Sequence, residues 1–342
     1  MKKILVTGGL GYIGSHTCVD LLEKKYEIII IDNLCNSELD TLNSIYSITK
    51  KKPKFFNCDI TNYEELFHLF KKNNIDCIIH FAALKSVSDS VQNPKKYFFN
   101  NVEGIKILLR CCKKFKVNKF IFSSSCTVYG IPKILPVNES LPFGEASSPY
   151  GETKIKSEEI LLKFCKENKL FKNISLRYFN PIGAHNSNLI GESPKGTPSN
   201  LVPIITKICF NKNIKLKVFG NDYNTKDGTA IRDYIHIEDL SKAHIKAYEY
   251  IKDSKNNYEF FNVGTGIGYS VIEVINTFEE ISGKKLNYIF AKRRKGDIEK
   301  IYADIKKVNK KMKWKAKFDL KKMLESAWSW ELKRNSNKKT LK

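Results

Sequence analysis

The sequence predicts an α/β fold, with a doubly wound parallel sheet followed by a smaller C-terminal α/β lobe. Apolar strands alternate with helices through the first half of the chain, and those strands lack polar residues at alternate positions. Strands of that kind are buried on both faces, as in a parallel sheet. A glycine-rich turn follows the first strand, and after Pro181 the chain becomes rich in Gly, Pro, Asn and Ser and its elements shorten. These three observations place a large sheet domain before a smaller lobe.

The first half contains six expected strands separated by helices. The strands are Lys3–Thr7, Glu27–Ile31 (closed by Asp32), Lys54–Asn57, and segments from Cys77, Lys119 and Asn173 onward. The helices are Tyr12–Lys24, Tyr63–Lys72, Pro94–Phe115 and Ser147–Asn168. The Tyr63–Lys72 segment, for example, has Leu66, Phe67, Leu69 and Phe70 on one side, as an amphipathic helix requires. This alternation gives an open sheet with helices on both faces.

The second half reads as shorter elements. We expect strands at Leu216–Phe219, Glu259–Val263 and Leu286–Phe290, and helices at Glu238–Ile251 and Val271–Ile281. Residues 1–181 are therefore predicted as the first domain, with parts of about 230–265 returning to it, and 182–334 as the second lobe. Residues 335–342 are predicted to be a polar, frayed tail.

Composition excludes several classes of protein. No apolar run approaches the roughly 20 residues of a membrane span, and the apolar stretch Ile4–Val6 is too short for a secretory signal. The nine cysteines contain no Cys-x-x-Cys pair, which indicates reduced thiols, and the six histidines show no metal-ligand spacing. We therefore expect a cytoplasmic protein with no metal and no membrane partner.

The net charge of +23 raises the alternative of a nucleic-acid partner. The lysines are spread along the chain in pairs such as Lys51-Lys52 and Lys71-Lys72, and Lys, Asn and Ile are all abundant. This pattern favours a solvated, compositionally biased surface over a specific polyanion site. We expect no specific nucleic-acid partner.

The glycines Gly8, Gly9, Gly11 and Gly14 follow a strand and open a helix. Glycine lets the backbone turn sharply and lets a pyrophosphate approach the helix N-terminus, which is the arrangement of a Rossmann dinucleotide site. Asp32 ends the second strand, where a carboxylate accepts bonds from ribose hydroxyls and repels a 2′-phosphate. The motif therefore predicts NAD rather than NADP; the alternative is a turn that merely uses glycine.

A second glycine stretch, GTGIG at Gly264–Gly268, also lies between a strand and a helix. No strand ending in an acid follows it at the right distance. We interpret it as a structural turn, with Ser270 able to cap the next helix, although a place near the ligand cleft is the alternative.

The catalytic candidates are Ser125, Tyr150 and Lys154. Ser125 ends the fifth strand, and in an open α/β sheet that edge faces the ligand crevice. Tyr150 and Lys154 are four residues apart, so they share one helix face. A lysine ammonium and the positive end of a bound nicotinamide would favour the phenolate, and Ser125 could bridge Tyr150 to a substrate hydroxyl. The alternative for the pair alone is a helix surface contact.

These motifs resemble the extended short-chain dehydrogenase/reductase family, and within it the UDP-glucose 4-epimerase family. The matching stretches run nearly end to end: VTGGLGYIGSHT, DNLCNS, HFAALKSVSDSV, FSSSCTVYG, SPYGETK, RYFNPIGAH, FGNDYNTKDGTAIRDYIHIEDL and RRKGD. The resemblance implies an NAD-dependent isomerase that interconverts UDP-galactose and UDP-glucose, in which tightly held NAD takes the 4-hydride and returns it to a transient 4-keto sugar. It also implies a homodimer through the helices Pro94–Phe115 and Ser147–Asn168.

The resemblance implies roles for individual residues. The cofactor-binding set is Gly8, Gly11, Tyr12, Ile13, Gly14, Asp32, Asn33, Asp59, Ile60, Phe81, Ala82, Lys85, Asn100, Tyr150 and Lys154. The substrate-binding set is Ser125, Tyr150, Phe179, Asn180, Asn200, Leu201, Lys217, Phe219, Arg232, Arg294, Asp297 and Ile301. Arg232 and Arg294 would pair with phosphates; the alternative for either alone is a surface ion pair. Ile301 occupies the position that gates the sugar pocket, where a small residue admits N-acetyl sugars and Tyr excludes them.

Three other functions are alternatives for this sequence. A nucleotide-sugar dehydratase or decarboxylase of the same fold is the nearest, but a dehydratase usually needs an Asp-Glu pair beside a strand-end Thr, whereas this chain has Ser125-Cys126-Thr127. A non-catalytic NAD-binding scaffold would be expected to lack Tyr150 or Lys154, and both are present. A nucleic-acid binder is suggested by charge alone.

Overall fold

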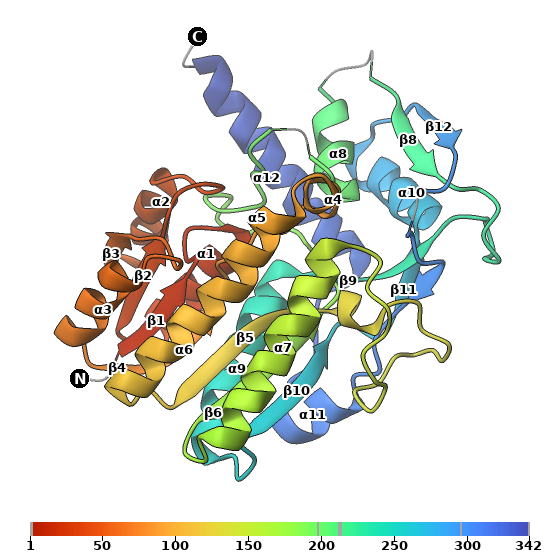
Figure 1. The fold of residues 1–342 in the computed structure, drawn as a ribbon. Helices are drawn as coiled ribbons and strands as arrows, with labels where there is room; N and C mark the ends of the chain where they lie inside the picture. The colour runs from red at the N-terminus through yellow and green to blue at the C-terminus, as the bar shows by residue number, and fades with distance from the viewer. Residues whose placement is uncertain (1–2, 197, 211–213, 295, 341–342) are drawn as a thin grey trace.

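A seven-stranded parallel sheet forms the centre of the molecule (Figure 1). The computed structural model describes residues 3–196, 198–210, 214–294 and 296–340. The strand order is β10-β6-β5-β4-β1-β2-β3. The strands are β1 (Lys3–Thr7), β2 (Ile28–Asp32), β3 (Lys54–Asn57), β4 (Ile75–His80), β5 (Lys119–Ser125), β6 (Lys172–Tyr178) and β10 (Tyr258–Val263). The predicted doubly wound α/β class is confirmed.

Two hydrophobic cores form because successive side chains of each strand point to opposite faces. Ile4 and Val6 of β1 belong to the core under α1 (Tyr12–Glu23) and α9 (Ile237–Asp253), whereas Leu5 belongs to the opposite core. The opposite core lies under α3 (Tyr63–Lys72), α6 (Gly104–Phe115) and α7 (Pro149–Glu167). Both faces of the sheet are thus covered by helices, which explains why its strands are apolar throughout.

The smaller lobe packs around a third core made by helices and short strands. Its strands are β7 (Asn180–Ile182), β9 (Ile231–His236), β11 (Gly268–Ser270) and β13 (Lys300–Ile301), with β8 (Leu216–Phe219) paired to β12 (Tyr288–Ala291). Its helices are α8 (Leu201–Ile208), α10 (Val271–Ser282) and α12 (Leu320–Thr340). Ser270 caps α10 in a reciprocal capping box with Glu273, as expected for the turn at Gly264–Gly268.

The order of elements along the chain differs from their order in space. Strand β10 pairs in parallel with β6, and α9 packs on α1, so these late segments lie in the first sheet and its cover. The division into residues 1–181 and 182–334 stays a prediction. The expected helix Pro94–Phe115 is divided into α5 (Pro94–Phe98), a π-helical turn at Phe99–Glu103 and α6.

Five helices of the described residues were not predicted: α2 (Asp40–Thr49), α4 (Val87–Gln92), α8, α11 (Lys306–Met312) and α12. Residues 335–340, expected to be frayed, continue α12, and residues 341–342 lie outside the described residues. The Asn335 amide donates to both the carbonyl and the carboxylate of Glu331 (2.9 and 2.8 Å). These contacts and the packing of Met323 and Leu324 in the third core support a helix that a polar sequence alone does not indicate.

Within the described ranges, no helix combines the length and the apolar character that crossing a bilayer requires.

A buried histidine makes the stability of the fold sensitive to acid. His244 of α9 packs between the rings of Phe81 and Tyr178, and burial lowers its pKa to about 4 from 6.5. Between pH 6.5 and 4 the unfolded chain protonates this histidine, whereas the folded chain keeps it neutral. The free energy of unfolding is therefore full above pH 6.5 and decreases as the pH falls toward 4. We expect the free energy of unfolding of His244→Phe to fall less steeply between pH 6.5 and 4 than that of the wild type, by about 1.4 kcal/mol per pH unit. Urea unfolding at a series of pH values measures this slope. Parallel curves for the two proteins would contradict this.

Candidate active site

One large cavity lies between the carboxyl ends of the sheet strands and the smaller lobe. Its volume is about 1120 Å³, which is large enough for two nucleotide ligands. Every residue predicted for the site lines it except Asp59. The cavity therefore brings together residues from Gly8 to Ile301, which span most of the chain.

The glycine-rich turn forms a cradle that side chains would fill. Gly8 has a φ of +66°, and a Cβ there would lie 2.7 Å from the backbone nitrogen of Ala82. A Cβ at Gly14 would overlap the carbonyl oxygen of Gly8. Gly11 caps α1, so the free N–H groups of that helix face the cavity edge. This backbone-lined space at a helix N-terminus fits the pyrophosphate of a dinucleotide.

The carboxylate of Asp32 lies beside this cradle. It accepts hydrogen bonds from Leu10 N (3.1 Å), Leu34 N (3.0 Å) and Ser37 Oγ (2.7 Å), which fix its orientation. Asp59 lies one step behind: its Oδ2 accepts a bond from Asn33 Nδ2 at 2.7 Å. A fixed negative charge at Asp32 fits a ribose with free hydroxyls and disfavours a 2′-phosphate. Asp59 thus orients Asn33 in this structure and does not line the cavity.

Ser125, Tyr150 and Lys154 lie together on the cavity wall. Ser125 ends β5, and its Oγ accepts a bond from Thr127 N at 3.2 Å. Ser148 caps α7, accepting a bond from Gly151 N, and places Tyr150 in the first turn and Lys154 one turn later. Lys154 Nζ donates to the Ser123 carbonyl at 2.7 Å and lies 5.8 Å from the centre of the Tyr150 ring.

The protonation of this group differs from the expectation. Burial raises the pKa of Tyr150 above its usual value, while the Ser125 hydroxyl acts in the opposite direction. Burial also lowers the pKa of Lys154 to about 8, which the Glu158 carboxylate partly offsets. The expected lowering of the Tyr150 pKa is therefore not found for the side chains alone, because desolvation of the buried phenol is the dominant effect.

A buried polar network supports the catalytic candidates from behind, and it was missed from sequence. Arg177 and Glu158 form an ion pair at 2.7 Å with side chains 2% and 0% exposed, and Ser124 Oγ also donates to Glu158. Ser124 directly precedes Ser125, and Glu158 lies one helical turn after Lys154. The four-residue spacing of Lys154 and Glu158 could have shown from sequence that Glu158 shares the helix face of the catalytic candidates. Thr153, one residue before Lys154, is fully buried and accepts a bond from the Asn101 amide at 3.1 Å.

The opposite wall of the cavity carries the predicted substrate residues. Arg232 lies in β9, with Nη1 donating to the Ile231 carbonyl at 2.8 Å. Arg294 makes a two-point contact with Asp297 (2.8 and 3.1 Å) and lies 4.9 Å from the Phe219 ring. Both arginines line the same cavity, which distinguishes them from unrelated surface pairs. Two guanidinium groups at one site suit a diphosphate.

A small apolar cluster encloses another part of the cavity. Cys126, Phe179 and Ile301 pack together there, and each lines the cavity. Ile301 is 2% exposed. Asn180, Asn200, Leu201 and Lys217 complete the predicted substrate wall. Among the described residues, no group of three or more His, Cys, Asp or Glu is placed to hold a metal ion.

Known proteins share this arrangement. A family model described as GDP-mannose 4,6 dehydratase matches residues 5–327. The UDP-glucose 4-epimerase of Bacillus subtilis (strain 168) is 47% identical over 328 residues, covering 96% of each chain. The chain belongs to the UDP-glucose 4-epimerase family. The Drosophila melanogaster family member is 45% identical over 335 residues, again covering 96% of each chain.

A crystal structure of the UDP-glucose 4-epimerase from Bifidobacterium longum in complex with NAD+ and UDP has the same fold. It superposes with a TM-score of 0.94 at 42% identity, covering 98% of this chain and 99% of that one. The matching family model is described as a dehydratase, but the acid pair that a dehydratase usually needs is not found at the end of β5 in this UDP-glucose 4-epimerase family member. Strand β5 ends in Ser125 and continues into Cys126 and Thr127, so the acid pair of a dehydratase is missing from the end of this strand.

Proposed function

We propose that this protein catalyses the reversible interconversion of UDP-galactose and UDP-glucose by epimerisation at C4. The observation that carries the proposal is that one cavity holds the glycine cradle, Tyr150 with Lys154, and the arginine pair. A hydride-transfer cofactor, a proton-transfer group and a diphosphate grip are the three parts that this reaction needs.

The proton-transfer steps belong to Tyr150. Its phenolate takes the proton from the 4-hydroxyl and later returns it, with Ser125 bridging the two oxygens. A bound NAD would supply a positive nicotinamide ring that favours this phenolate and a reversible acceptor for the hydride of C4. Lys154 adds positive charge beside Tyr150 and binds the cofactor ribose. Because the hydride returns to the same sugar, retention of the cofactor by the glycine cradle is part of the reaction.

The substrate is held by its UDP part. Arg232 and Arg294 bind the diphosphate, and Phe219 and Leu201 lie along the nucleotide. Binding of the diphosphate would release Arg294 from Asp297, which is then free to accept a bond from the uridine ribose. Firm contacts at UDP leave the sugar free to rotate and present either face.

The activity is tested by incubating purified protein with UDP-galactose, with no added NAD, and measuring UDP-glucose. We expect product from protein that retains its cofactor. Folded, NAD-loaded protein that gives no UDP-glucose would contradict the proposed function.

Ile301 is proposed to set tolerance for the N-acetyl group. It is larger than the residues that admit N-acetyl sugars and smaller than Tyr, so we expect weak to moderate turnover of UDP-N-acetylglucosamine. Ile301→Tyr should lower that turnover at least about tenfold, since added bulk in a buried site costs about 1–3 kcal/mol, while UDP-galactose turnover changes much less. The two substrates serve as each other's control. A wild-type enzyme with no N-acetyl turnover would overturn this proposal.

We also propose a cytoplasmic homodimer. The dimer would form through Pro94–Phe115 and Ser147–Asn168, and Phe99 (59% exposed) presents apolar surface in the first of these segments. Light scattering coupled to gel filtration tests this, since a single-chain mass would contradict it.

A further inference from the structure

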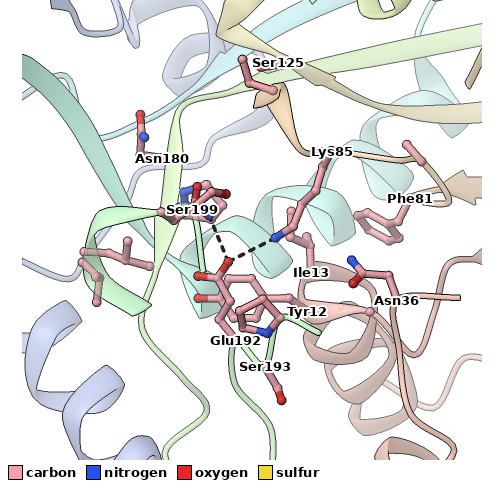
Figure 2. A pocket seen from close by; sticks show the side chains of 18 of the residues that line it. Tyr12, Ile13, Asn36, Phe81, Lys85, Ser125, Asn180, Glu192, Ser193 and Ser199 are labelled. Atoms are coloured by element: carbon pink, nitrogen blue, oxygen red, sulfur yellow. Dashed lines mark hydrogen bonds and ion pairs between the residues drawn. The ribbon is translucent and has the colours of Figure 1, made fainter. Parts of the chain in front are cut away.

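The carboxylate of Glu192 contacts both sides of the cavity mouth. Its Oε1 accepts bonds from Lys85 Nζ at 3.1 Å and from Asn200 Nδ2 at 3.0 Å. Lys85 follows β4 of the large sheet, whereas Asn200 caps the start of α8 in the smaller lobe. Figure 2 shows Lys85 reaching toward Glu192, with Tyr12 beside it and Ser125 well away from it. One oxygen atom therefore joins the proposed cofactor side to the proposed substrate side.

The position of Glu192 is fixed from behind by the C-terminal helix. Trp330 Nε1 donates to the Glu192 carbonyl at 3.1 Å, and a Cβ at Gly191 would lie 2.6 Å from the Trp330 ring. Asn188 Nδ2 also donates to Ser329 Oγ of α12 at 2.8 Å. The backbone that carries the carboxylate is therefore held independently of Lys85 and Asn200.

The chemistry of a carboxylate decides how Asn200 is oriented. An ionised carboxylate only accepts hydrogen bonds, so the Asn200 amide must present its NH₂ group to Glu192. That choice fixes where its carbonyl oxygen and its second N–H point. Lys85 meanwhile offsets a negative charge that would otherwise repel a diphosphate at the mouth. A glutamine at position 192 can donate as well as accept, so it would not enforce this orientation.

We propose that Glu192 is a positioning residue that sets UDP affinity by orienting the Asn200 amide. The identity of the ligand rests on the proposed function. Glu192 contacts lie at the mouth and not at Tyr150, so its effect falls on binding and not on the chemical step.

The test is a double-mutant cycle on UDP affinity, measured by titration calorimetry with NAD-loaded protein. We expect E192Q to weaken UDP binding about tenfold, because the Asn200 amide is then no longer oriented before UDP binds and must be ordered on binding. In an Asn200→Ala background the same change should have less than about a twofold effect, since the partner is gone. E192Q removes the carboxylate charge in both backgrounds, but it can disturb the orientation of the Asn200 amide only where Asn200 is present. The difference between the two backgrounds therefore measures the effect of orientation. In assays, E192Q should raise KM for UDP-galactose and leave kcat nearly unchanged.

Glu249→Gln is the matched control. Glu249 also accepts from two donors, Lys24 (3.3 Å) and Lys246 (2.8 Å), but it lies on α9 outside the cavity. It should leave UDP affinity unchanged. Equal effects of E192Q in the two backgrounds, or no effect in either, would overturn the positioning role. Calorimetry needs no turnover, so a wild-type protein that binds UDP without epimerising would fail the proposed function and leave this inference open to the same cycle.

Discussion

Tyr150→Phe is expected to lower the kcat for UDP-galactose by about 10³-fold, within the range that general acid–base groups contribute. The substitution removes one oxygen and keeps the ring, so the packing around the first turn of α7 should survive. Neither Lys154, which donates to the Ser123 carbonyl, nor Ser125 can replace the lost phenol, because neither is placed as a base by this structure. UDP binding depends on the opposite wall of the cavity, so its Kd should stay within about twofold of the wild-type value.

The measurement is a steady-state assay paired with UDP calorimetry on the same preparations. Tyr46→Phe is a suitable control, since Tyr46 lies in α2 with half of its surface exposed. It should match the wild type in both measurements. Retention of more than about a tenth of wild-type kcat by Tyr150→Phe would remove Tyr150 as the base.

Gly14→Ala is expected to destabilise the protein and abolish stable NAD retention. Alanine inside a helix normally stabilises by about 0.5–1 kcal/mol relative to glycine. At Gly14 the sign reverses, because the new Cβ overlaps the Gly8 carbonyl and lies 2.8 Å from the Gly9 Cα. These atoms are backbone and cannot move aside like a flexible side chain. We expect a loss of about 1–3 kcal/mol in the free energy of unfolding, and a distorted cradle.

Gly151→Ala provides the matched comparison. Gly151 also lies early in a helix, but a Cβ there would meet its nearest neighbour at 3.5 Å, an ordinary contact. This variant should be as stable as the wild type or slightly more stable, and should keep its NAD. Denaturant unfolding and the NAD content of purified protein measure both effects. A Gly14→Ala protein that retains NAD at wild-type stoichiometry would contradict the role of the cradle.

Local patterns account for much of the fold. The apolar runs of β1, β2 and β5 predict strands buried on both faces, and those strands lie in the middle of the sheet. Helix α12 was not predicted because its sequence is polar toward its end. Its stability comes from packing on α10 and α8, which the local sequence does not show. Strand β10 was expected as a strand, but its partner β6 lies far back in the chain, and the pairing depends on how the two halves dock.

The candidate site residues could be predicted from local motifs: the glycine cradle, Asp32, Ser125 and the Tyr150–Lys154 spacing each follow from one turn or one helix. The environment of those groups depends on how the whole chain packs. Burial, a property of the whole packed fold, raises the pKa of Tyr150 although Lys154 is near, and it places Arg177 against Glu158 behind Ser125. Glu192 lies in an irregular segment with no periodicity to read, so only folding brings its carboxylate between Lys85 and Asn200. Spacing along the chain encodes contacts within one element, whereas contacts between distant elements depend on the path of the chain between them.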